Sequence, residues 1–460
     1  MNTKDKKIQE LELTVARQAK QLDAQAKQIK ELLAQVDELK RRLALNSTNS
    51  SKPPSSDGLS KKNNNRSLRE TDSKKFGGQF DHKGDTLNQT DAPDNTIEYT
   101  PEKCDACGDT LSGIEVDNII ERQEIDIEVK KIITAHKALV KICRCGKKNI
   151  GTMPERLKAP MQYGPDIRAM GAYLGNQFIS KKRISNIFQD LFGIQISDTT
   201  LMTFDKELAN KLEVFNNNAF NAIIKALIKC LDETGLRIAG KLYWVHVAST
   251  EFLTYYRIDP KRGSMLEGVT GKIVHDHLKT YFTIKNVEHV LCNAHHLREL
   301  RALIEFDKEE WARKMHDLLK KASRLIKPPP KEQEKISKKY DQIVKAGLQY
   351  HDSLGKLKEN SCKKRPGHNL LIRLRDFKLE TLLFLYDPNV PFTNNLAERD
   401  LRMIKLKQKV SGCFRTEKGA HDFASSRSFI STIQKQGLNV FQSISAVFNN
   451  SFDFNSLRYA

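Results

Sequence analysis

The most regular pattern of apolar residues lies in residues 8–43, where they recur with the seven-residue period of a coiled coil. The a positions are Ile8, Val15, Leu22, Ile29, Val36 and Leu43, and the d positions are Leu11, Gln18, Gln25, Leu32 and Leu39. β-branched residues at many a positions, with mostly leucine at d, favour a parallel two-stranded coiled coil, and the two glutamines would lower its stability but could fix its register. The alternative is one amphipathic helix that packs on its own chain. We expect a coiled coil in residues 1–45, and therefore a homo-oligomer.

The apolar pattern stops at the next segment, residues 46–95. It opens with NSTNSSKPPSSDG and continues with KKNNNR. Such a composition buries too little apolar surface to offset the entropy of ordering, so we expect a flexible linker. Its basic residues could touch DNA phosphates, although a solvated tether explains them more simply.

Helical spacing returns in residues 156–220. Two apolar faces predict two helices, one with Ile167, Met170, Tyr173 and Leu174, the next with Ile184, Ile187, Phe188 and Leu191. Gly193 breaks this run, and Ser197–Asp198 can cap a third helix that begins near Thr199. Short helices with a glycine-containing turn, and the polar start Thr199–Thr200, suit a helix-turn-helix reader of a DNA groove. The alternative is a helical bundle with a purely structural role.

After Cys230 the period becomes that of β-strands, and residues 221–304 predict a mixed α/β unit. Three consecutive strands form an antiparallel meander, and a short helix, a strand, a second helical connection, a fifth strand and a helix follow. The strand-like runs are 231–235, 242–247, 252–258, 272–276 and 288–294, and the helices are expected at 264–269 and 296–304. This order is that of the ribonuclease-H-like fold, with Asp232 on the first strand and Asp276 at the end of the fourth.

Composition narrows the class of partner. Among 460 residues, Lys and Arg outnumber Asp and Glu by 77 to 57, a formal charge of +20. This surplus favours nucleic acid or an anionic membrane surface over a merely soluble basic protein. No segment approaches the roughly 20 apolar residues of a membrane span, and the polar start lacks the apolar core of a signal peptide. We therefore expect double-stranded DNA as the partner, no membrane, and a cytoplasmic protein that is nucleoid-associated when bound.

The eight cysteines do not resemble a secreted disulfide framework, and four of them are clustered. Cys104 and Cys107 form one pair, and Cys143 and Cys145 form the other, after a stretch rich in Ile and Val. Four thiolates from two tight turns, brought together by a β-hairpin, would bind Zn²⁺ tetrahedrally and stabilise a small β-rich module in residues 96–155. The second pair is one residue shorter than the usual spacing, which leaves His136 as a substitute ligand. The alternative is four unrelated reduced thiols.

The other four cysteines, Cys230, Cys292, Cys362 and Cys413, are isolated in the sequence. A free cysteine behaves as a small apolar residue and is often buried. We interpret these four as buried apolar residues.

Asp232 and Asp276 are candidate ligands of a divalent cation. Carboxylates that share a site repel each other, and their pKa values rise unless a cation offsets the charge. Two Mg²⁺ ions about 4 Å apart would do so, and would hold the attacking and leaving oxygens of a phosphoryl transfer. The simpler alternative is that each Asp is a turn or strand-end residue.

The third candidate acid is Glu398, in the segment TNNLAER. Asn395 followed three residues later by Glu398 also resembles a helix-capping arrangement, in which the Glu would only satisfy backbone amides. The residues that follow favour chemistry, because residues 399–427 contain eight Lys or Arg and three acids. A helix with an acid at its start and cations along it can hold a metal and bind phosphates. The candidate DNA-binding cations are Arg399, Arg402, Lys405, Lys407, Lys409 and Arg415.

Several of these segments resemble the transposases of the insertion sequence 66 family, in order along nearly the whole chain. They are the SSKPPSSDG segment after a coiled coil, the small cysteine module, LDETGLR, and PFTNNLAERDLRMIKLKQKVSGCFRT with its Asn-Asn-x-Ala-Glu-Arg motif. The resemblance implies a DDE active site on a ribonuclease-H-like fold, which here gives Asp232, Asp276 and Glu398. The surroundings of Asp276 match more loosely than the others. Cys292-Asn-Ala-His295 with Arg298 also resembles a family block that supports the site or contacts DNA.

The resemblance also orders the rest of the chain. Residues 305–385 become a helical insertion, interrupted at KPPPK, that could support dimerisation or hold DNA. Residues 386–435 contain the core helix with the third acid, and residues 436–460 form a C-terminal tail. The expected fold class is a multidomain α+β/α protein with a coiled coil, a zinc module, a helical region and a ribonuclease-H-like core.

The function implied by the resemblance is metal-dependent cleavage and joining of DNA at the ends of an insertion sequence. The cofactors would be Mg²⁺ or Mn²⁺ at the three acids and Zn²⁺ at the cysteines. The main alternative is a catalytically inactive, domesticated DNA-binding regulator, and a weaker one is a structural coiled-coil adaptor. Inverted repeats bordering the gene would favour the transposase.

Overall fold

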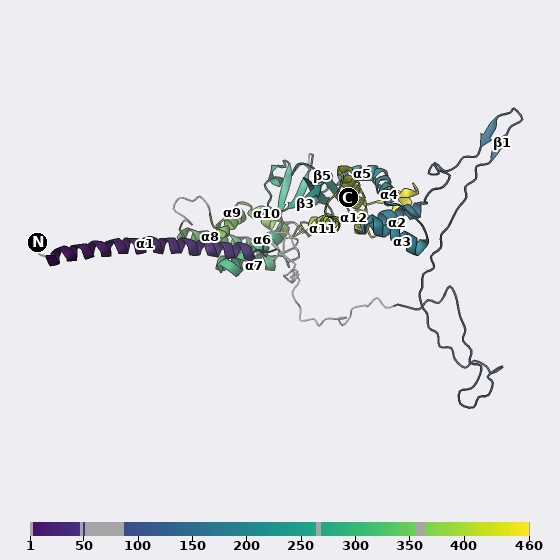
Figure 1. The fold of residues 1–460 in the computed structure, drawn as a ribbon, viewed down its shortest axis with the longest axis horizontal. Coiled ribbons are helices and arrows are strands. Elements are labelled where there is room, and N and C mark those ends of the chain that lie inside the picture. The colour runs from purple at the N-terminus through teal and green to yellow at the C-terminus, as the bar shows by residue number, and fades with distance from the viewer. Residues whose placement is uncertain (1–2, 47–48, 51–86, 264–267, 356–363, 460) are drawn as a thin grey trace.

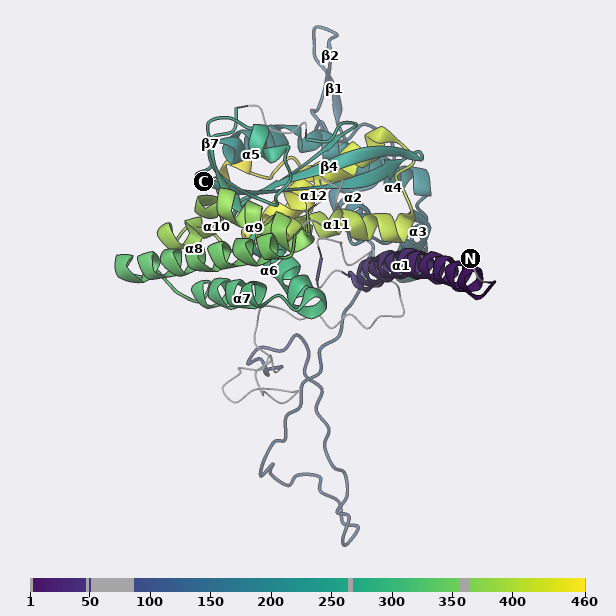
Figure 2. The same cartoon turned by 90° about the vertical axis from the view of Figure 1, so that its left-hand side faces the viewer.

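The computed structural model describes residues 3–46, 49–50, 87–263, 268–355 and 364–459. In these residues a long N-terminal helix and an extended segment project from a body made of one large sheet and many helices (Figures 1 and 2). Most of the SSKPPSSDG segment, the middle of the expected linker, and most of the helix expected at 264–269 lie outside the described residues, as does Cys362. None of the described helices combines the length and apolar composition needed to cross a membrane.

The N-terminal helix α1, Thr3–Ala44, confirms the helical prediction for this segment. Its heptad a and d residues are exposed, with fractions between 43% at Val36 and 82% at Leu43. The alternative of a helix that packs this face on its own chain is therefore wrong. The end of α1 contacts the body, where Arg41 pairs with Asp307 at 3.0 Å. Pairing of the apolar face with a second copy stays a prediction.

Residues 87–155 contain little regular structure. A short hairpin is formed by the antiparallel strands β1, Val140–Ile142, and β2, Lys148–Ile150, but it flanks only the turn of Cys143 and Cys145 and does not join the two cysteine pairs as the prediction required. The large apolar residues of the segment are exposed, for example Ile119 at 78% and Ile127 at 81%. In the structure this segment therefore has a hairpin but no hydrophobic core of its own.

The predicted helical region is present as four helices: α2 Pro165–Asn176, α3 Lys181–Phe192, α4 Asp198–Lys211 and α5 Glu213–Lys225. Gly193 ends α3 with the left-handed φ of 60° that glycine adopts easily. Ser197 caps α4 by accepting a hydrogen bond from the backbone N–H of Thr200 at 3.1 Å. Both signals in the sequence therefore act as expected.

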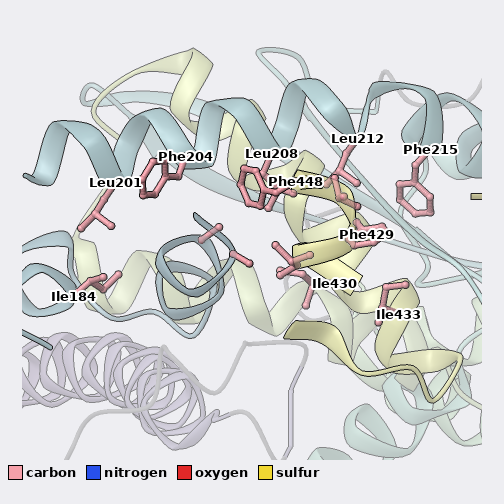
Figure 3. Packing of buried hydrophobic residues seen from close by; sticks show 14 of the residues in the cluster. Ile184, Leu201, Phe204, Leu208, Leu212, Phe215, Phe429, Ile430, Ile433 and Phe448 are labelled. Atoms are coloured by element: carbon pink, nitrogen blue, oxygen red, sulfur yellow. The ribbon is translucent and has the colours of Figure 1, made fainter. Parts of the chain in front are cut away.

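The helical region does not bury its apolar face alone. Leu201, Phe204 and Leu208 of α4 belong to the same hydrophobic core as Phe429, Phe448 and other apolar residues from the C-terminal segment (Figure 3). These come from α12, Glu417–Lys435, from α13, Val440–Phe448, and from the last turn, η4, Phe454–Ser456. The segment described above as a C-terminal tail therefore completes the core of the helical region.

The large sheet has five strands in the order β5-β4-β3-β6-β7. Its strands are β3 Ile228–Ile238, β4 Lys241–Ser249, β5 Thr254–Asp259, β6 Gly271–His275 and β7 Val287–Leu291. The first three are antiparallel, whereas β6 pairs in parallel with both β3 and β7. A single 3₁₀ turn, η2 Tyr281–Thr283, lies between β6 and β7. The predicted strands and the predicted antiparallel meander are confirmed.

The two faces of the sheet are covered by different helices. On one face, Leu231 of β3 and Ile273 of β6 pack with Ile223 of α5. On the other face, Cys230 and Val274 pack with apolar residues of α11, Asn395–Ser411. Side chains of β3 with even numbers therefore face α11, which decides where the candidate acids project.

The predicted helical insertion is present between β7 and α11. It follows α6, Asn293–Ala302, and a π-helical turn, Leu303–Asp307. Its helices are α7 Glu310–Ala322, α8 Pro330–Ser353, α9 Pro366–Asp376 and α10 Lys378–Tyr386. They share a core with Leu297 and Leu300 of α6, so the insertion is attached to the helix that leaves the sheet.

Candidate catalytic site

Asp232 and Asp276 lie at the same level of neighbouring parallel strands. The ladder between β3 and β6 pairs Ile228 with Lys272 and Cys230 with Val274. Two residues further along both strands, the same register brings Asp232 opposite Asp276, just after the end of β6. Both positions continue the alternation of Cys230 and Val274, which face α11. The sheet thus directs both carboxylates towards the helix that contains Glu398.

Glu398 lies in the first turns of α11, which packs across β3 and β4 (Figure 1). Its side chain is 15% exposed and contacts Arg298 of α6, whose Nη2 lies 3.5 and 3.4 Å from Oε1 and Oε2. No side chain caps the N-terminus of α11. The capping interpretation of Glu398 is therefore wrong, and its carboxylate faces α6.

The electrostatics of Asp232 place all three acids within reach of one another. The pKa of Asp232 is raised to about 8, mainly by burial and in addition by the negative charges of Asp276, Glu398 and Glu233, while the backbone N–H of Glu233 opposes the shift. Burial also raises the pKa of Asp276, and the nearby His295 opposes this shift. The charges of Asp276 and Glu398 both act on Asp232, so the three carboxylates could offer oxygen ligands to one or two cations.

Glu233 follows Asp232 directly but faces the other side of the sheet. Its carboxylate lies 3.2 Å from Nδ1 of His246, its partner on β4, and also pairs with Arg262. Burial alone would raise its pKa, but the pairing with His246 and Arg262 lowers it overall. Glu233 is therefore neutralised by its neighbours, whereas Asp232 is not.

Two polar residues hold the start of α11 against the sheet. Asn394 is buried, and its Nδ2 donates a hydrogen bond of 2.7 Å to the carbonyl oxygen of Leu231. Its backbone N–H donates to Sγ of Cys292 at 3.1 Å, and the thiol of Cys292 lies 3.9 Å from Oε1 of Glu398. The backbone N–H of Cys292 donates to His275 at the end of β6. These contacts tie the helix with Glu398 to the strand ends next to Asp232 and Asp276.

The sequence analysis assigned no role to Asn394 or Glu233. It first interpreted Cys292 as a buried apolar residue. Cys230 and Cys292 are indeed buried and Cys413 is half-buried. The signals that could have identified these roles were the paired asparagines before Glu398 and the acid next to Asp232.

The donor atoms fit a divalent cation. Among the described residues, one group of potential ligands is compact: Cys292, His295 and Glu398 have donor atoms within 4.8 Å of one another. Asp232 and Asp276 lie outside this group, and burial is the main cause of their raised pKa values; Glu398 adds to the shift of Asp232, and His295 opposes the shift of Asp276. Ligands of two ions about 4 Å apart spread more widely than the ligands of one. Carboxylate oxygens are the donors that Mg²⁺ and Mn²⁺ prefer.

The candidate DNA-binding cations of α11 and its continuation divide into two groups. Four of them, Arg399, Arg402, Lys409 and Arg415, are exposed. Lys405 is half-buried and donates from Nζ to the carbonyl oxygen of Gly235 at 2.8 Å. Lys407 lies over the ring of Phe423 at 5.6 Å, and burial lowers its pKa. The last two therefore also stabilise the packing of the helix.

Arg402 and Lys409 lie on the same side of α11 as Glu398, because residues four and eleven positions apart share a helix face. At the start of α4, Thr199 is exposed, whereas the hydroxyl of Thr200 lies 2.8 Å from Oγ of Ser197. Both threonines thus remain near the surface at a helix N-terminus.

Each predicted cysteine pair occupies a tight turn. The backbone N–H of Gly108 donates to Cys104 at 2.9 Å, and that of Gly146 donates to Cys143 at 2.8 Å. Backbone N–H groups within each turn lower the pKa of Cys104 and Cys143, which favours thiolates. The structure does not bring the two pairs into one compact group of ligands among the described residues. His136 is exposed.

A comparison with protein families decides the identity. The family model described as Transposase IS66 family matches residues 161–422, more than half of the chain. The chain belongs to the IS66 family of transposases.

The matched residues of this IS66 transposase span the helical region, the sheet, the insertion and α11, and they contain Asp232, Asp276 and Glu398. A second model, of a family of unknown function, matches residues 2–88. No curated protein matches the chain in sequence. Membership gives the chain a function related to transposition.

Proposed function

We propose that this IS66 transposase cuts and joins DNA at the ends of an insertion sequence, with Asp232, Asp276 and Glu398 as its catalytic acids on a ribonuclease-H-like core. The strand order, three antiparallel strands followed by two parallel ones, supports this core. The observation that carries the proposal is the placement of Asp232 and Asp276 at the same level of neighbouring parallel strands, on the face of the sheet covered by the helix that contains Glu398. The raised pKa of Asp232, caused by burial and by the charges of Asp276 and Glu398, agrees with this placement. Buried carboxylates that repel one another are expected where a bound cation offsets their charge.

The reaction has two steps with the same geometry. Water attacks a phosphodiester at each end, a P–O bond forms and another breaks, and the leaving 3′ oxygen takes a proton to become a free hydroxyl. That hydroxyl then attacks a phosphodiester of the target DNA, so one P–O bond replaces another. No covalent intermediate with the protein is required. Bound Mg²⁺ or Mn²⁺ would supply the charge that activates the attacking oxygen and stabilises the leaving one.

The chain's own contribution is to hold the three acids in place. Asn394 fixes the start of α11 on β3 through the carbonyl oxygen of Leu231. Arg298 holds both oxygens of Glu398. Arg402 and Lys409 extend along the same face of α11, where they would bind the phosphates of DNA that enters the site. Regions further away would recognise the ends: the helical region with Thr199 and Thr200, and the cysteine module.

The proposal is tested by incubating the full chain with labelled element-end DNA and a plasmid, with Mg²⁺, with Mn²⁺ and with a chelator. We expect labelled plasmid only when a metal is present. If the chain binds end DNA but does not join it under any of these conditions, then either the chain is an inactive regulator or it requires a helper protein. Adding cell extract from a host of the element distinguishes these two explanations, because only a chain that lacks a helper would then join DNA.

The exposed cations of α11 give a prediction about DNA binding. We expect Arg402→Ala to weaken binding to any DNA sequence and to lower the slope of log Kd against log salt by about one, because one phosphate contact is lost. Fluorescence anisotropy over a range of salt concentrations measures this slope. The matched control is Lys20→Ala on the exposed surface of α1, which should leave the slope unchanged. An unchanged slope for Arg402→Ala would remove α11 from the proposed DNA path.

We also propose that α1 pairs with α1 of a second copy. Its apolar heptad face is exposed along the whole helix, which supports a partner of the same pattern. We expect Ile29→Lys to shift the chain from dimer to monomer in sedimentation experiments, because the charge would fall in the seam. Lys30→Gln changes the next residue, outside the seam, and should leave the dimer intact. A dimer of unchanged stability in Ile29→Lys would place the self-association elsewhere.

Finally, we propose that Cys104, Cys107, Cys143 and Cys145 bind Zn²⁺. The two tight turns and the lowered pKa values of Cys104 and Cys143 support thiolate ligands. Elemental analysis of the purified chain tests this, and a chain free of zinc would contradict it.

A protein that acts on chromosomal DNA would work in the cytoplasm, at the nucleoid.

A further inference from the structure

His295 occupies the first turn of α6, beside the proposed metal site. Its Nδ1 lies 3.9 Å from Oε1 of Glu398, and its side chain is 19% exposed. This Nδ1 atom is itself buried and has no hydrogen-bond partner among the described residues. A buried nitrogen without a hydrogen-bond partner lowers the stability of the fold, so we expect Nδ1 of His295 to have a function.

The separation of 3.9 Å is informative. It is longer than a hydrogen bond between nitrogen and oxygen, which spans about 2.7–3.2 Å. Two ligands that each lie about 2.1 Å from one ion are about 3 to 4 Å apart, depending on the angle between them. The two atoms are therefore spaced like ligands of one cation.

His295 also lies near Asp276, because the charged form of its imidazole would oppose the rise in the pKa of that carboxyl. His295 is thus within electrostatic reach of both the second and the third acid. Glu398 keeps room for a cation, because a carboxylate offers about four lone-pair positions and Arg298 approaches it only at 3.4–3.5 Å. The imidazole is the only nitrogen ligand in the compact group formed with Cys292 and Glu398 in the described part of the chain.

We propose that His295 binds, through Nδ1, the same divalent cation as Glu398, and so adds a nitrogen ligand to the oxygen ligands of the site. This inference rests on the proposed function, because it assumes that Glu398 and Asp276 bind metal. Cys292 is a weaker candidate, because its Sγ already accepts the backbone N–H of Asn394, and burial raises the pKa of the thiol to about 12.

A nitrogen ligand changes which cation the site prefers. Imidazole suits transition metals such as Mn²⁺ and Co²⁺, whereas Mg²⁺ and Ca²⁺ prefer oxygen. The site should therefore favour Mn²⁺ over Mg²⁺ more strongly than three carboxylates alone would. Loss of His295 should reduce the affinity for Mn²⁺ more than the affinity for Mg²⁺.

The test uses Mn²⁺ itself and needs no DNA or joining activity. Pulsed electron paramagnetic resonance of Mn²⁺ bound to the full chain detects the nuclear spin of a directly coordinated ¹⁴N. We expect this nitrogen signal in the wild type and its loss in His295→Ala. Loss of a direct ligand should also reduce the Mn²⁺ affinity by more than the about 10- to 100-fold that loss of a ligand's hydrogen-bond partner typically costs.

Two further variants separate ligation from folding. His295→Asn puts an amide oxygen near the position of Nδ1, so it should keep most of the metal affinity but lose the nitrogen signal. His421→Ala removes an exposed histidine of α12 and should change neither the signal nor the affinity. If His295→Ala does not fold, His295→Asn decides the inference, because loss of the nitrogen signal in that variant identifies the ligand.

The outcomes distinguish the inference from the proposed function. Mn²⁺ binding that depends on Glu398 but shows no nitrogen signal would overturn the role of His295 and leave the three carboxylates in place. Mn²⁺ binding that persists in Glu398→Gln, or no binding at all, would overturn both. A nitrogen signal that survives in His295→Ala would assign the ligand to another histidine and overturn the inference.

Discussion

Asp232→Asn will abolish the joining of element-end DNA to a plasmid while the protein still binds those ends. The amide cannot replace a charged ligand of the metal, and metal-ion catalysis of phosphoryl transfer contributes several kcal/mol, so joining should fall by about a thousandfold or more. Binding should persist, because the exposed cations of α11 and the helical region are unchanged. Glu251→Gln, in the exposed turn between β4 and β5, is the matched control and should join DNA normally.

Although Asp232→Asn should abolish joining, it should stabilise the fold when no metal is bound. A folded pKa of about 8, above the ordinary value of 3.8, means that Asp232 favours folding below its ordinary pKa and loses this contribution as pH rises towards 8. In a chelator at pH 8, Asp232→Asn should therefore melt at a higher temperature than the wild type. Added Mn²⁺ should reverse this order, because bound ligand stabilises only the chain that binds it well.

Each acid can be examined in the same way. Asp276→Asn and Glu398→Gln should also abolish joining, because each would remove one ligand. Retained joining in Asp276→Asn would show that the second acid had been misassigned. If Asp232→Asn itself still joined DNA near the wild-type rate, the proposed site would be wrong as a whole.

Asp400→Ala should lower the free energy of unfolding by about 3–5 kcal/mol, the usual cost of leaving a buried charge without its partner. Asp400 lies two residues after Glu398 and faces the sheet, where Oδ2 accepts hydrogen bonds from Ser249 at 2.6 Å and Thr254 at 3.0 Å. The same oxygen lies 2.9 Å from Nζ of Lys435 on α12, and both side chains are nearly buried. Without Asp400 the ammonium group of Lys435 has no counter-charge.

Urea unfolding followed by tryptophan fluorescence measures this change, because Trp244 lies on β4 of the same sheet. Asp400→Asn keeps hydrogen-bonding atoms and should lose less stability than Asp400→Ala. The control is Glu334→Ala, whose partner Lys338 and whose own side chain are exposed at 71% and 64%, and which should cost less than about 1 kcal/mol. Equal effects of Asp400→Ala and Glu334→Ala would show that the buried network does not stabilise the fold.

Much of the sheet could be predicted from the sequence, because the signals were local. The alternation of apolar residues gave the strands, and the order of the strands placed Asp232 on the first and Asp276 at the end of the fourth. Glycine at 193 and serine at 197 marked the ends of helices for well-understood reasons. The position of Glu398 in the first turns of a helix was also visible in its sequence.

What sequence could not give depends on contacts between distant segments. Nothing local indicates that Asn394 donates to Leu231, 163 positions earlier, or that Lys405 donates to Gly235 rather than to a phosphate. Nor does the pair Asp232–Glu233 show which acid faces the site, since that depends on which helix covers each face of the sheet. Such roles emerge only when the whole core is assembled.

The core that joins α4 to α12 and α13 has a consequence for how this protein is made. The helices of the helical region emerge from the ribosome early, but the residues that complete their core, including Phe429 and Phe448, are synthesised only after the sheet and the helical insertion. Translation proceeds at about 5–20 residues per second, so the apolar faces of α2 to α5 stay exposed until α12 and α13 have been synthesised. A product that ends before α12 would therefore lack the residues that complete the core of the helical region and the Lys435 partner of Asp400, so we expect premature termination to yield an unstable chain.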